Sequence, residues 1–304
     1  MAGMETSSDG PGADLRRRLE ASLGRTVESV RRVHGGYTNA DRWVLGLNDG
    51  LAAFAKVGSD SDTARWLRDE IAVYDTVDEL FMPDVLAAEA SDQEPFLVLE
   101  DLSKGYWPPP WDESAVARVR DTLEAMAGVA APAWFAPLGE LVEGVTGWPD
   151  VAADPGPFLS LGLCSEWWLQ EALPVLLDSA RSADFSGSAL VHGDIRSDNL
   201  CLMETRVVVI DWDNARAGNA MFDLAMWLPS LEAEGGPPPE TLLPNSEGLA
   251  SFASGYFASR AGLAPRPHAP RVRDVQRAQL LSALPWTIRE LGLAPLDGPS
   301  APRE

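Results

Sequence analysis

Hydrophobic residues in the first third of the chain alternate with polar ones in short segments and then recur at helical spacing. Residues 27–35, 41–47 and 51–58 alternate as strands do, and an Asn-Asp-Gly turn signal separates the last two. Residues 63–81 carry apolar side chains every three or four positions, as an amphipathic helix does. Residues 95–102, nearly all apolar, are typical of a buried strand. We therefore expect a small antiparallel sheet with a helix packed against it.

The rest of the chain is mostly helical by the same criterion. Residues 103–190 show helical spacing that proline- and glycine-rich segments interrupt. Two short apolar runs, at 188–194 and 206–213, are predicted to pair with each other around a loop. Three further helices are predicted towards the C-terminus, at 221–231, 248–262 and 273–292.

These patterns predict a mixed α+β protein with two lobes. A short helix at 14–24 leads into an N-lobe of residues 15–102, which contains the sheet. A mainly helical C-lobe of residues 103–293 contains the remaining elements. Small and polar residues dominate 1–14 and 294–304, which we expect to form a disordered N-terminus and a flexible tail.

Charge and composition narrow the possible functions. The 304 residues include 24 basic and 46 acidic side chains, giving a net charge of -22. Such a charge repels nucleic acid and anionic lipid, so we expect neither a nucleic-acid partner nor membrane association. The chain contains no run of 18 apolar residues, and its two cysteines lack metal-ligand spacing. These features favour a reducing, cytoplasmic environment.

The most informative segment lies between the two short apolar runs. It reads VHGDIRSDNL and contains Asp194 and Asn199, and Asp211 follows twelve residues after Asn199 in the sequence IDWD. Phosphoryl transfer needs a carboxylate that orients the accepting hydroxyl and oxygen ligands for a magnesium ion that bridges the phosphates. Asp194 has the chemistry of the first group, and Asn199 and Asp211 have that of the second. We interpret His192 as a packed residue that supports the loop and Arg196 as a local charge partner.

The HGDxxxxN and IDWD motifs together resemble the catalytic and metal-binding loops of the aminoglycoside phosphotransferase family. The members of this family are small-molecule O-phosphotransferases. This resemblance implies a bilobal fold like that of protein kinases, with ATP or GTP as phosphate donor. It implies that Asp194 is the catalytic residue and that Asn199 and Asp211 bind Mg²⁺. An element similar to the family's GxPxxDLA follows, in which Asp223 supports the catalytic loop.

The nucleotide-binding residues come from the N-lobe by the same resemblance. Lys56 lies on the third predicted strand and Glu70 lies fourteen residues later on the predicted helix, so we expect an ion pair that holds the lysine against the phosphates. Gly36 and Thr38 lie in HGGYTN, where the fold covers the phosphates. We also expect the nucleotide's base to contact the connection between the lobes, where Glu100 and Leu102 are the candidates.

The acceptor is less defined. Between Lys104 and Ala180 we count eleven acidic and three basic residues. This excess of negative charge would attract a cationic substrate, but solvated helix faces account for it equally well. Six of the chain's eleven tryptophans lie in the same region, where indoles stack on sugars or bases but more often form core. We expect a hydroxyl-bearing antibiotic, such as an aminoglycoside or a sugar- or nucleoside-containing compound.

Other functions agree with the same motifs. Choline, homoserine, fructosamine and macrolide kinases have similar motifs, so a metabolite kinase is the nearest alternative. A catalytically silent nucleotide-binding pseudokinase is another, although the intact Lys56, Asp194 and Asp211 argue against it. Only eleven residues separate Asp211 from Asp223, which leaves no room for the long activation segment of a protein kinase.

Overall fold

The computed structural model describes residues 10–33, 39–144, 147–266 and 271–298. The chain divides into two compact units, and the first comprises residues 1–106 together with 201–214. The second comprises residues 107–200 and 215–304. The sheet belongs to the first unit and most helices to the second, which confirms the predicted α+β class.

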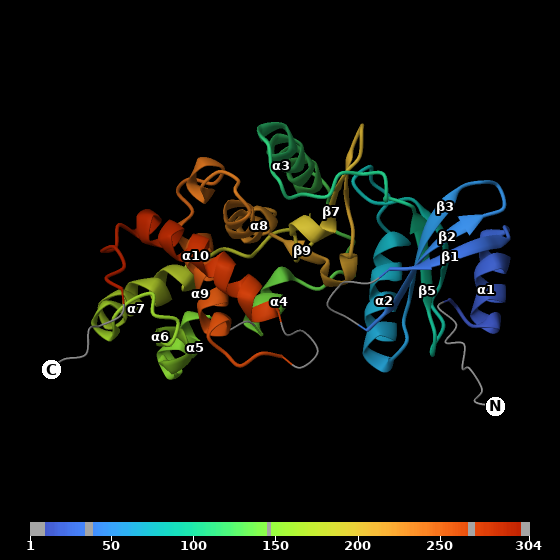
Figure 1. Ribbon diagram of the computed structural model, residues 1–304. Coiled ribbons are helices and arrows are strands. Elements are labelled where there is room, and N and C mark those ends of the chain that lie inside the picture. Colours follow the sequence, from blue (N-terminus) through green and yellow to red (C-terminus); the bar gives the residue numbers. More distant parts are fainter. Residues whose placement is uncertain (1–9, 34–38, 145–146, 267–270, 299–304) are drawn as a thin grey trace, which may run out of the picture. The chain divides into compact units, whose positions relative to one another are not determined.

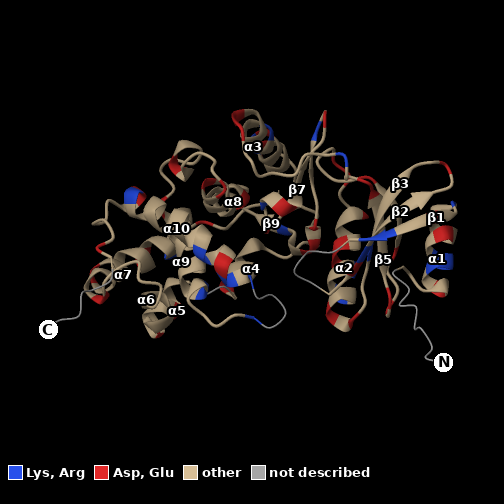
Figure 2. Ribbon diagram, viewed as in Figure 1, with Lys and Arg blue, Asp and Glu red and all other residues tan. Residues whose placement is uncertain are grey.

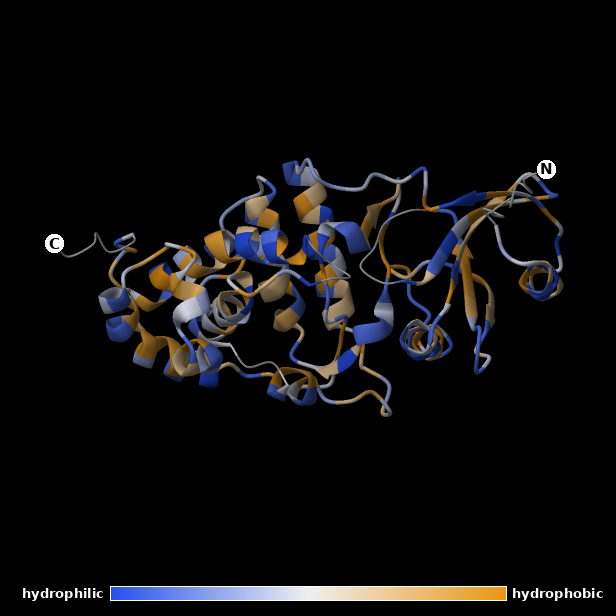
Figure 3. Cartoon of the chain, turned by 60° about the horizontal axis from the view of Figure 1, so that its bottom comes forward, coloured by the Kyte–Doolittle hydropathy of each residue, from blue (hydrophilic) through white to orange (hydrophobic). Residues whose placement is uncertain are grey.

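The first unit is built around a five-stranded antiparallel sheet in the order β1-β2-β3-β5-β4 (Figure 1). Helices α1 and α2 cover opposite faces of this sheet, and hydrophobic residues run along the strands between them (Figure 3). The predicted helices and strands of this region are all present. The bounds of the elements are α1 Ala13–Leu23, β1 Val27–Arg32, β2 Asp41–Leu47, β3 Ala52–Val57, α2 Ser61–Tyr74, β4 Val85–Glu89 and β5 Phe96–Glu100.

Strand alternation determines which face each helix covers. On β3, Ala53, Ala55 and Val57 are buried in one core together with Leu15 and Leu19 of α1. The intervening residues of a strand point to the other face, so they point towards α2. Helix α2 begins with a capping box, in which the Asp60 side chain and Thr63 bond reciprocally. The sheet is thus covered on both sides by helices.

The structure differs from the sequence-based predictions at two places in this unit. Helix α2 ends at Tyr74, whereas the pattern predicted a helix as far as residue 81. β-Branched Thr76 and Val77 disfavour helix, and Leu80, which fitted the helical pattern, is 80% exposed. Strand β4 was not predicted, because its alanines have low strand propensity and it lies at the edge of the sheet.

The segment 201–214 is part of the first unit although it is distant in sequence. It carries most of β7 (Leu200–Leu202), β8 (Val207–Val209) and the one-turn helix η2 (Trp212–Asn214). Arg206, in the turn between the two strands, donates to the carbonyl oxygens of Leu80 and Met82 at 3.2 Å each. Its guanidinium also forms an ion pair with Glu100. These contacts fix the hairpin to the loop before β4 and to the end of β5.

The pairing predicted for the two short apolar runs was wrong. Strand β6 (Ala189–Val191) pairs with β9 (Arg216–Gly218), and β7 pairs with β8. Each strand has only three residues, so the hydrophobic pattern contains too little information to choose a partner. The intervening segment itself contributes a strand, which the prediction had treated as loop.

The second unit is mainly helical, and its core lies between α5, α6, α7, α9 and α10. Trp148 is fully buried there and donates from Nε1 to the carbonyl oxygen of Ser251 at 2.9 Å. A side chain at Gly255 would lie 2.7 Å from the Trp148 ring, so glycine permits this close approach of α9 to α5. The bounds are α3 Glu113–Ala127, α4 Leu138–Glu143, α5 Trp148–Ala153, α6 Gly156–Leu159, α7 Glu166–Arg181, η1 Ser197–Asn199, α8 Met221–Ala233, η3 Pro239–Thr241, α9 Glu247–Ala261 and α10 Val272–Leu291.

A few described residues of the two terminal segments belong to helices or make contacts with the rest of the chain. Helix α1 begins at Ala13, inside the segment expected to be disordered. In the segment expected to be a flexible tail, the Ala294 carbonyl accepts a bond from Trp168 Nε1 at 2.8 Å. Asp297 caps the start of α7 by accepting from the backbone of Ser165 at 2.7 Å. Leu296 of the same segment packs against the hydrophobic core of the second unit, so apolar as well as polar contacts hold its described residues. The functional domain boundaries themselves stay a prediction.

Among the described residues, no helix combines the length and apolar character needed to cross a membrane. Figure 2 shows acidic positions on several helices of the second unit, including α3, α4 and α7. They are spread over separate elements, as solvated helix faces are.

Candidate active site

Lys56, Glu70 and Asp211 come together in the first unit. Lys56 Nζ lies 2.7 Å from Glu70 Oε2 and 2.5 Å from Asp211 Oδ1. The lysine is therefore shared between two carboxylates that are fourteen and 155 residues away in the sequence. The predicted pair of Lys56 and Glu70 is present, and Asp211 was not predicted to join it.

Local structure explains how each side chain reaches this cluster. Lys56 is one of the β3 residues that point towards α2, and Glu70 is on the buried face of that helix with 2% exposure. Asp211 follows β8 and has a φ of 70°, which is rare for residues other than glycine. Such a conformation persists only where the surrounding structure imposes it, and it is concentrated at functional sites.

The carboxylates of Glu70 and Asp211 favour the charged form of Lys56. Burial on its own lowers the pKa of the Lys56 ammonium, but the nearby negative charges of Glu70 and Asp211 outweigh burial and raise that pKa above its usual value. The ammonium is therefore charged at any physiological pH. It is a compact cation of the kind that binds phosphate oxygens.

The second unit contains the HGD loop, and a buried aspartate holds it. Asp223, on the first turn of α8, accepts from the backbone N–H groups of His192 at 2.7 Å and Gly193 at 2.8 Å. Burial raises the pKa of the Asp223 carboxyl, while His192 and the two N–H donors lower it. Gly193 has a φ of 84°, so a residue with a side chain would be strained there. The support that the resemblance implied for Asp223 is confirmed.

His192 is fully buried, and its Nδ1 accepts from the backbone N–H of Asp194 at 3.2 Å. Nδ1 therefore acts as the acceptor in this contact. The contact also fixes the backbone of Asp194. The interpretation of His192 as a supporting residue is confirmed.

Asp194 has two close side-chain neighbours within its own loop. Asn199 donates from Nδ2 to the Asp194 carbonyl at 2.9 Å and lies 3.5 Å from its Oδ2. Arg196 Nε lies 3.2 Å from Asp194 Oδ1, and its Nη2 lies 3.3 Å from Asp198. Arg196 is thus the local charge partner that the sequence suggested. One of the two carboxylates that it contacts is that of Asp194, the predicted catalytic residue.

Glu234 is a member of this region that the sequence did not indicate. Its carboxylate accepts from Ser197 Oγ at 2.7 Å and from Trp111 Nε1 at 2.8 Å. The Trp111 ring also packs edge-on against Trp227. Glu234 therefore connects the loop that contains Asp194 to the proline-rich WPPPW segment. No motif marks it, because its role depends on the position of α8 rather than on neighbouring residues.

The remaining predicted nucleotide contacts stay predictions. The Glu100 side chain is paired with Arg206 and accepts from the backbone of Asp84 at 2.9 Å. Leu102 is buried, and its carbonyl accepts from the backbone of Gly105 at 2.9 Å. Gly36 and Thr38 lie outside the described residues.

The predicted metal ligands have suitable chemistry. Asn199 belongs to the second unit and Asp211 to the first. An amide oxygen and a carboxylate are the hard donors that Mg²⁺ takes, usually together with phosphate oxygens and water. The Asn199 amide uses its nitrogen for Asp194, which leaves its oxygen for a cation. Within the described ranges, no three His, Cys, Asp or Glu side chains gather in a way that would hold a metal ion.

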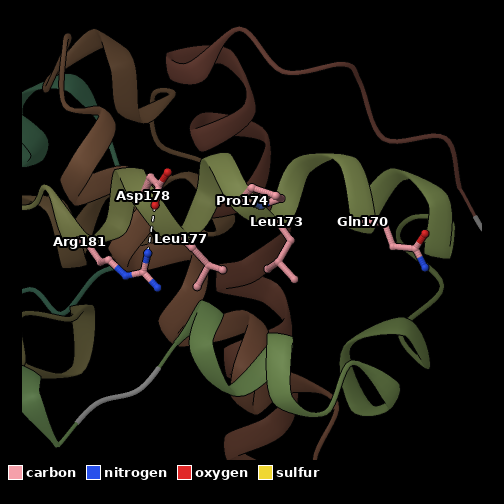
Figure 4. A pocket seen from close by; sticks show the side chains of 6 residues that line it. All are labelled: Gln170, Leu173, Pro174, Leu177, Asp178 and Arg181. Carbon is pink, nitrogen blue, oxygen red and sulfur yellow. Dashed lines mark hydrogen bonds and ion pairs between the residues drawn. The ribbon is translucent and has the colours of Figure 1, made fainter.

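A shallow cavity of 380 Å³ lies elsewhere in the second unit (Figure 4). All of its lining residues come from α7, and Arg181 forms an ion pair with Asp178 at 3.0 Å beside it. It contains none of the predicted site residues. We assign it no role in the chemistry.

Comparison with known proteins identifies what the chain resembles. A family model described as a phosphotransferase enzyme family matches residues 29–259. A search of curated proteins found no match. Three solved structures are similar in fold. An aminoglycoside phosphotransferase from Alicyclobacillus acidocaldarius has a TM-score of 0.58 at 16% identity and covers 95% of this chain and 97% of its own.

The second structure is a spectinomycin phosphotransferase in complex with ADP and spectinomycin, with a TM-score of 0.56 at 13% identity over 93% of this chain and 99% of its own. A protein from Haemophilus somnus described as a putative fructosamine-3-kinase has a TM-score of 0.51 at 12% identity over 88% of this chain and 96% of its own. At these identities the likeness shows the fold alone.

Proposed function

Because the chain belongs to the phosphotransferase enzyme family, we propose that it moves the γ-phosphate of ATP or GTP to a hydroxyl of a small antibiotic in the cytoplasm. The acceptor class is an aminoglycoside or another sugar- or nucleoside-containing antibiotic. The biological role is resistance or self-protection. The kinase-type phosphotransferase chemistry follows from the family.

The observation that carries this proposal is the position of Lys56 between Glu70 and Asp211. A buried ammonium held by two carboxylates is a fixed positive charge that nucleotide phosphates can approach. The intact Lys56 and the unusual backbone conformation of Asp211, which contacts it, argue against a silent pseudokinase.

In the proposed mechanism, Lys56 holds the phosphates and Asp194 orients the acceptor hydroxyl for in-line attack. Asn199 and Asp211 carry the oxygen donors that would hold magnesium, which would offset the negative charge of the phosphates. Arg196 places a positive charge beside the Asp194 carboxylate, with its Nε 3.2 Å from Oδ1. The hydroxyl oxygen forms the new bond to the γ-phosphorus as the bond from that phosphorus to the bridging oxygen of the β-phosphate breaks. The Asp194 carboxylate accepts the hydroxyl proton, and ADP or GDP is the leaving group.

Support for an antibiotic acceptor comes from relatives and from charge. One of the solved structures with a similar fold is a spectinomycin phosphotransferase in complex with ADP and spectinomycin. Residues 221–293 contain seven acidic residues and six arginines, so this part of the second unit is nearly neutral. We therefore expect an acceptor with few positive charges, such as spectinomycin, before a highly cationic aminoglycoside.

A metabolite kinase is the second candidate, because a fructosamine kinase shares the fold and the same near-neutral surface suits a sugar. One experiment separates the two. Mass spectrometry would follow ATP- and GTP-dependent phosphate transfer to a panel of aminoglycosides, spectinomycin, nucleoside antibiotics, macrolides, choline, homoserine and fructosamines.

A mass gain of one phosphate on an antibiotic, abolished by Asp194→Ala, is the expected result. Asp194→Ala should still bind nucleotide, since Lys56 lies outside its loop. Transfer only to a metabolite would replace the antibiotic assignment. Transfer that persists in Asp194→Ala would refute the role of Asp194.

A further inference from the structure

Helix α8 contacts the loop 192–199 from both of its ends. At the start of the helix, Asp223 accepts from the backbone N–H groups of the two residues before Asp194. At the other end, Glu234 is the C-cap residue and accepts from Ser197 Oγ at 2.7 Å. The two contacts therefore lie on either side of Asp194 in the sequence, and all of these residues belong to the second unit.

Two glycines fix the backbone at Glu234. The N–H of Gly236 donates to the carbonyl oxygen of Leu231 at 2.8 Å, and the N–H of Gly235 donates to the carbonyl oxygen of Glu232 at 3.0 Å. This is the Schellman arrangement that ends many helices with a residue of positive φ. Gly235 has a φ of 93°, which residues with a side chain rarely adopt. Glu234 is therefore held at the end of the helix by backbone hydrogen bonds.

Both carboxylate oxygens of Glu234 accept a hydrogen bond. Oε1 accepts from Ser197 Oγ, and Oε2 accepts from Trp111 Nε1 at 2.8 Å. The Trp111 ring lies edge-on against Trp227, with 5.5 Å between the ring centroids, and Trp227 is fully buried on α8. Because the indole is anchored in this way, the orientation of the carboxylate is fixed, and so is the position of the Ser197 side chain.

Ser197 is the first residue of η1, the one-turn helix that contains Asn199. The turn closes with a hydrogen bond from the Leu200 N–H to the Ser197 carbonyl, and the Asn199 N–H donates to the Arg196 carbonyl at 2.9 Å. Asn199 also donates from Nδ2 to the Asp194 carbonyl at 2.9 Å. One turn of backbone thus connects Ser197 to both predicted functional residues of the loop.

We propose that Glu234 is a positioning residue that holds the loop of Asp194 and Asn199 in the geometry for phosphoryl transfer. The inference rests on the proposed function. Glu234 acts through Ser197 and needs no contact with nucleotide or acceptor. Asp223 fixes the backbone before Asp194, and Glu234 fixes the turn after it, so one helix holds the loop on both sides.

The first test is Glu234→Ala, measured by steady-state kinetics with the acceptor found by mass spectrometry. At a temperature well below the unfolding transition of the variant, turnover should fall about 10- to 100-fold, because small displacements of a reacting group have effects of this size. The affinity for ADP without magnesium, measured by calorimetry, should stay within about 2-fold of the wild type, because Lys56 lies in the first unit.

Glu234→Gln separates the hydrogen bonds from the negative charge. The amide oxygen can accept from the Trp111 indole, which is only a donor, and the amide nitrogen can donate to Ser197 Oγ, because a hydroxyl is both donor and acceptor. Turnover should therefore stay within about 3-fold of the wild type. Glu143→Ala is the control. It removes an exposed carboxylate from the end of α4 and should leave turnover unchanged.

Ser197→Ala tests the connection through the loop. It should lower turnover about as much as Glu234→Ala, and combining the two should cause no further loss, because both remove the same contact. Hydrogen–deuterium exchange of the protein without ligands gives an independent measurement. The backbone amides of Asn199 and Leu200, which close the turn, should exchange faster in both variants.

The inference is overturned if Glu234→Ala turns over as the wild type does, or if Glu234→Gln is as slow as Glu234→Ala. It is also overturned if Ser197→Ala adds its full effect in the Glu234→Ala background. The exchange measurement needs no acceptor. Unchanged exchange in a chain that transfers phosphate contradicts this inference alone. Faster exchange in the variants of a chain whose wild type transfers phosphate to no compound of the panel contradicts the proposed function alone.

Discussion

The Lys56 cluster and the HGD loop are held by different kinds of interaction. Lys56, Glu70 and Asp211 interact through charged side chains, and two of these residues are 155 positions apart. In the HGD loop, side chains of Asp223 and His192 bind backbone N–H groups, and the longest of these connections spans 31 positions. The first arrangement changes when another charged group arrives, whereas the second has its geometry fixed by the backbone.

This difference suggests a division of tasks. A cluster of charges is suited to a charged ligand whose phosphates replace one set of ionic contacts by another. A loop fixed through its backbone is suited to holding Asp194 in one position for the acceptor hydroxyl. The following variants are expected to affect one region and leave the other intact.

The largest effect is expected from Lys56→Met, which removes the cation of the first region. Turnover should fall about 100- to 1000-fold, the usual effect of losing one group that stabilises transition-state charge. Steady-state kinetics with the acceptor found by mass spectrometry would measure it. A variant with normal turnover would show that Lys56 has no part in transfer.

Asp223→Ala is the matching change in the second region. It leaves two backbone N–H groups without their acceptor, and each buried unsatisfied donor costs about 1–3 kcal/mol. We expect a lower free energy of unfolding and lower turnover, with nucleotide affinity retained. Urea unfolding and calorimetry with ADP would measure both quantities. Equal losses of affinity and turnover would show that the regions are not independent.

Arg206→Met tests the attachment of the segment 201–214 within the first unit. The variant loses contacts with two carbonyl groups and with Glu100, and both partners of the ion pair are mostly buried. We expect a destabilisation of about 1–2 kcal/mol. The unfolding temperature should fall by about 2–6 °C for a chain of this size. Arg181→Met, which removes an exposed ion pair of α7, is the control and should have almost no effect.

The smallest expected effect is on the alkylation rate of the two buried cysteines. Each unit contains one of them, so the rates report on the units separately. Burial raises the pKa of Cys201, in the first unit, and of Cys164, in the second, to about 11 each. At pH 8 a thiol with that pKa is about 0.1% thiolate, so alkylation of the native protein should be very slow. The rate should rise with pH as the thiolate forms. Mass spectrometry of peptides after labelling would follow each site.

The same labelling compares the stability of the two regions. Nucleotide binds the first unit through Lys56 in the proposed mechanism, so it should slow labelling of Cys201 more than that of Cys164. Equal protection at both sites would mean that nucleotide stabilises the whole chain as one unit.

Much of this protein is determined by local features of its sequence. Alternation in residues 41–47 and 52–57 defines strands because side chains on successive residues face opposite sides. The order of Lys56, Asp194 and Asp211 indicates phosphoryl transfer because each residue type carries a distinct part of that chemistry. These features need no knowledge of distant contacts.

Other features were decided only by the tertiary structure. The three-residue strands β6 and β8 found partners other than each other, because so short a pattern does not distinguish one neighbour from another. Glu234 and Arg206 are ordinary residues in the sequence, and their importance arises from the groups placed beside them. Burial and long-range proximity give these side chains their energies, and both exist only once the chain has folded.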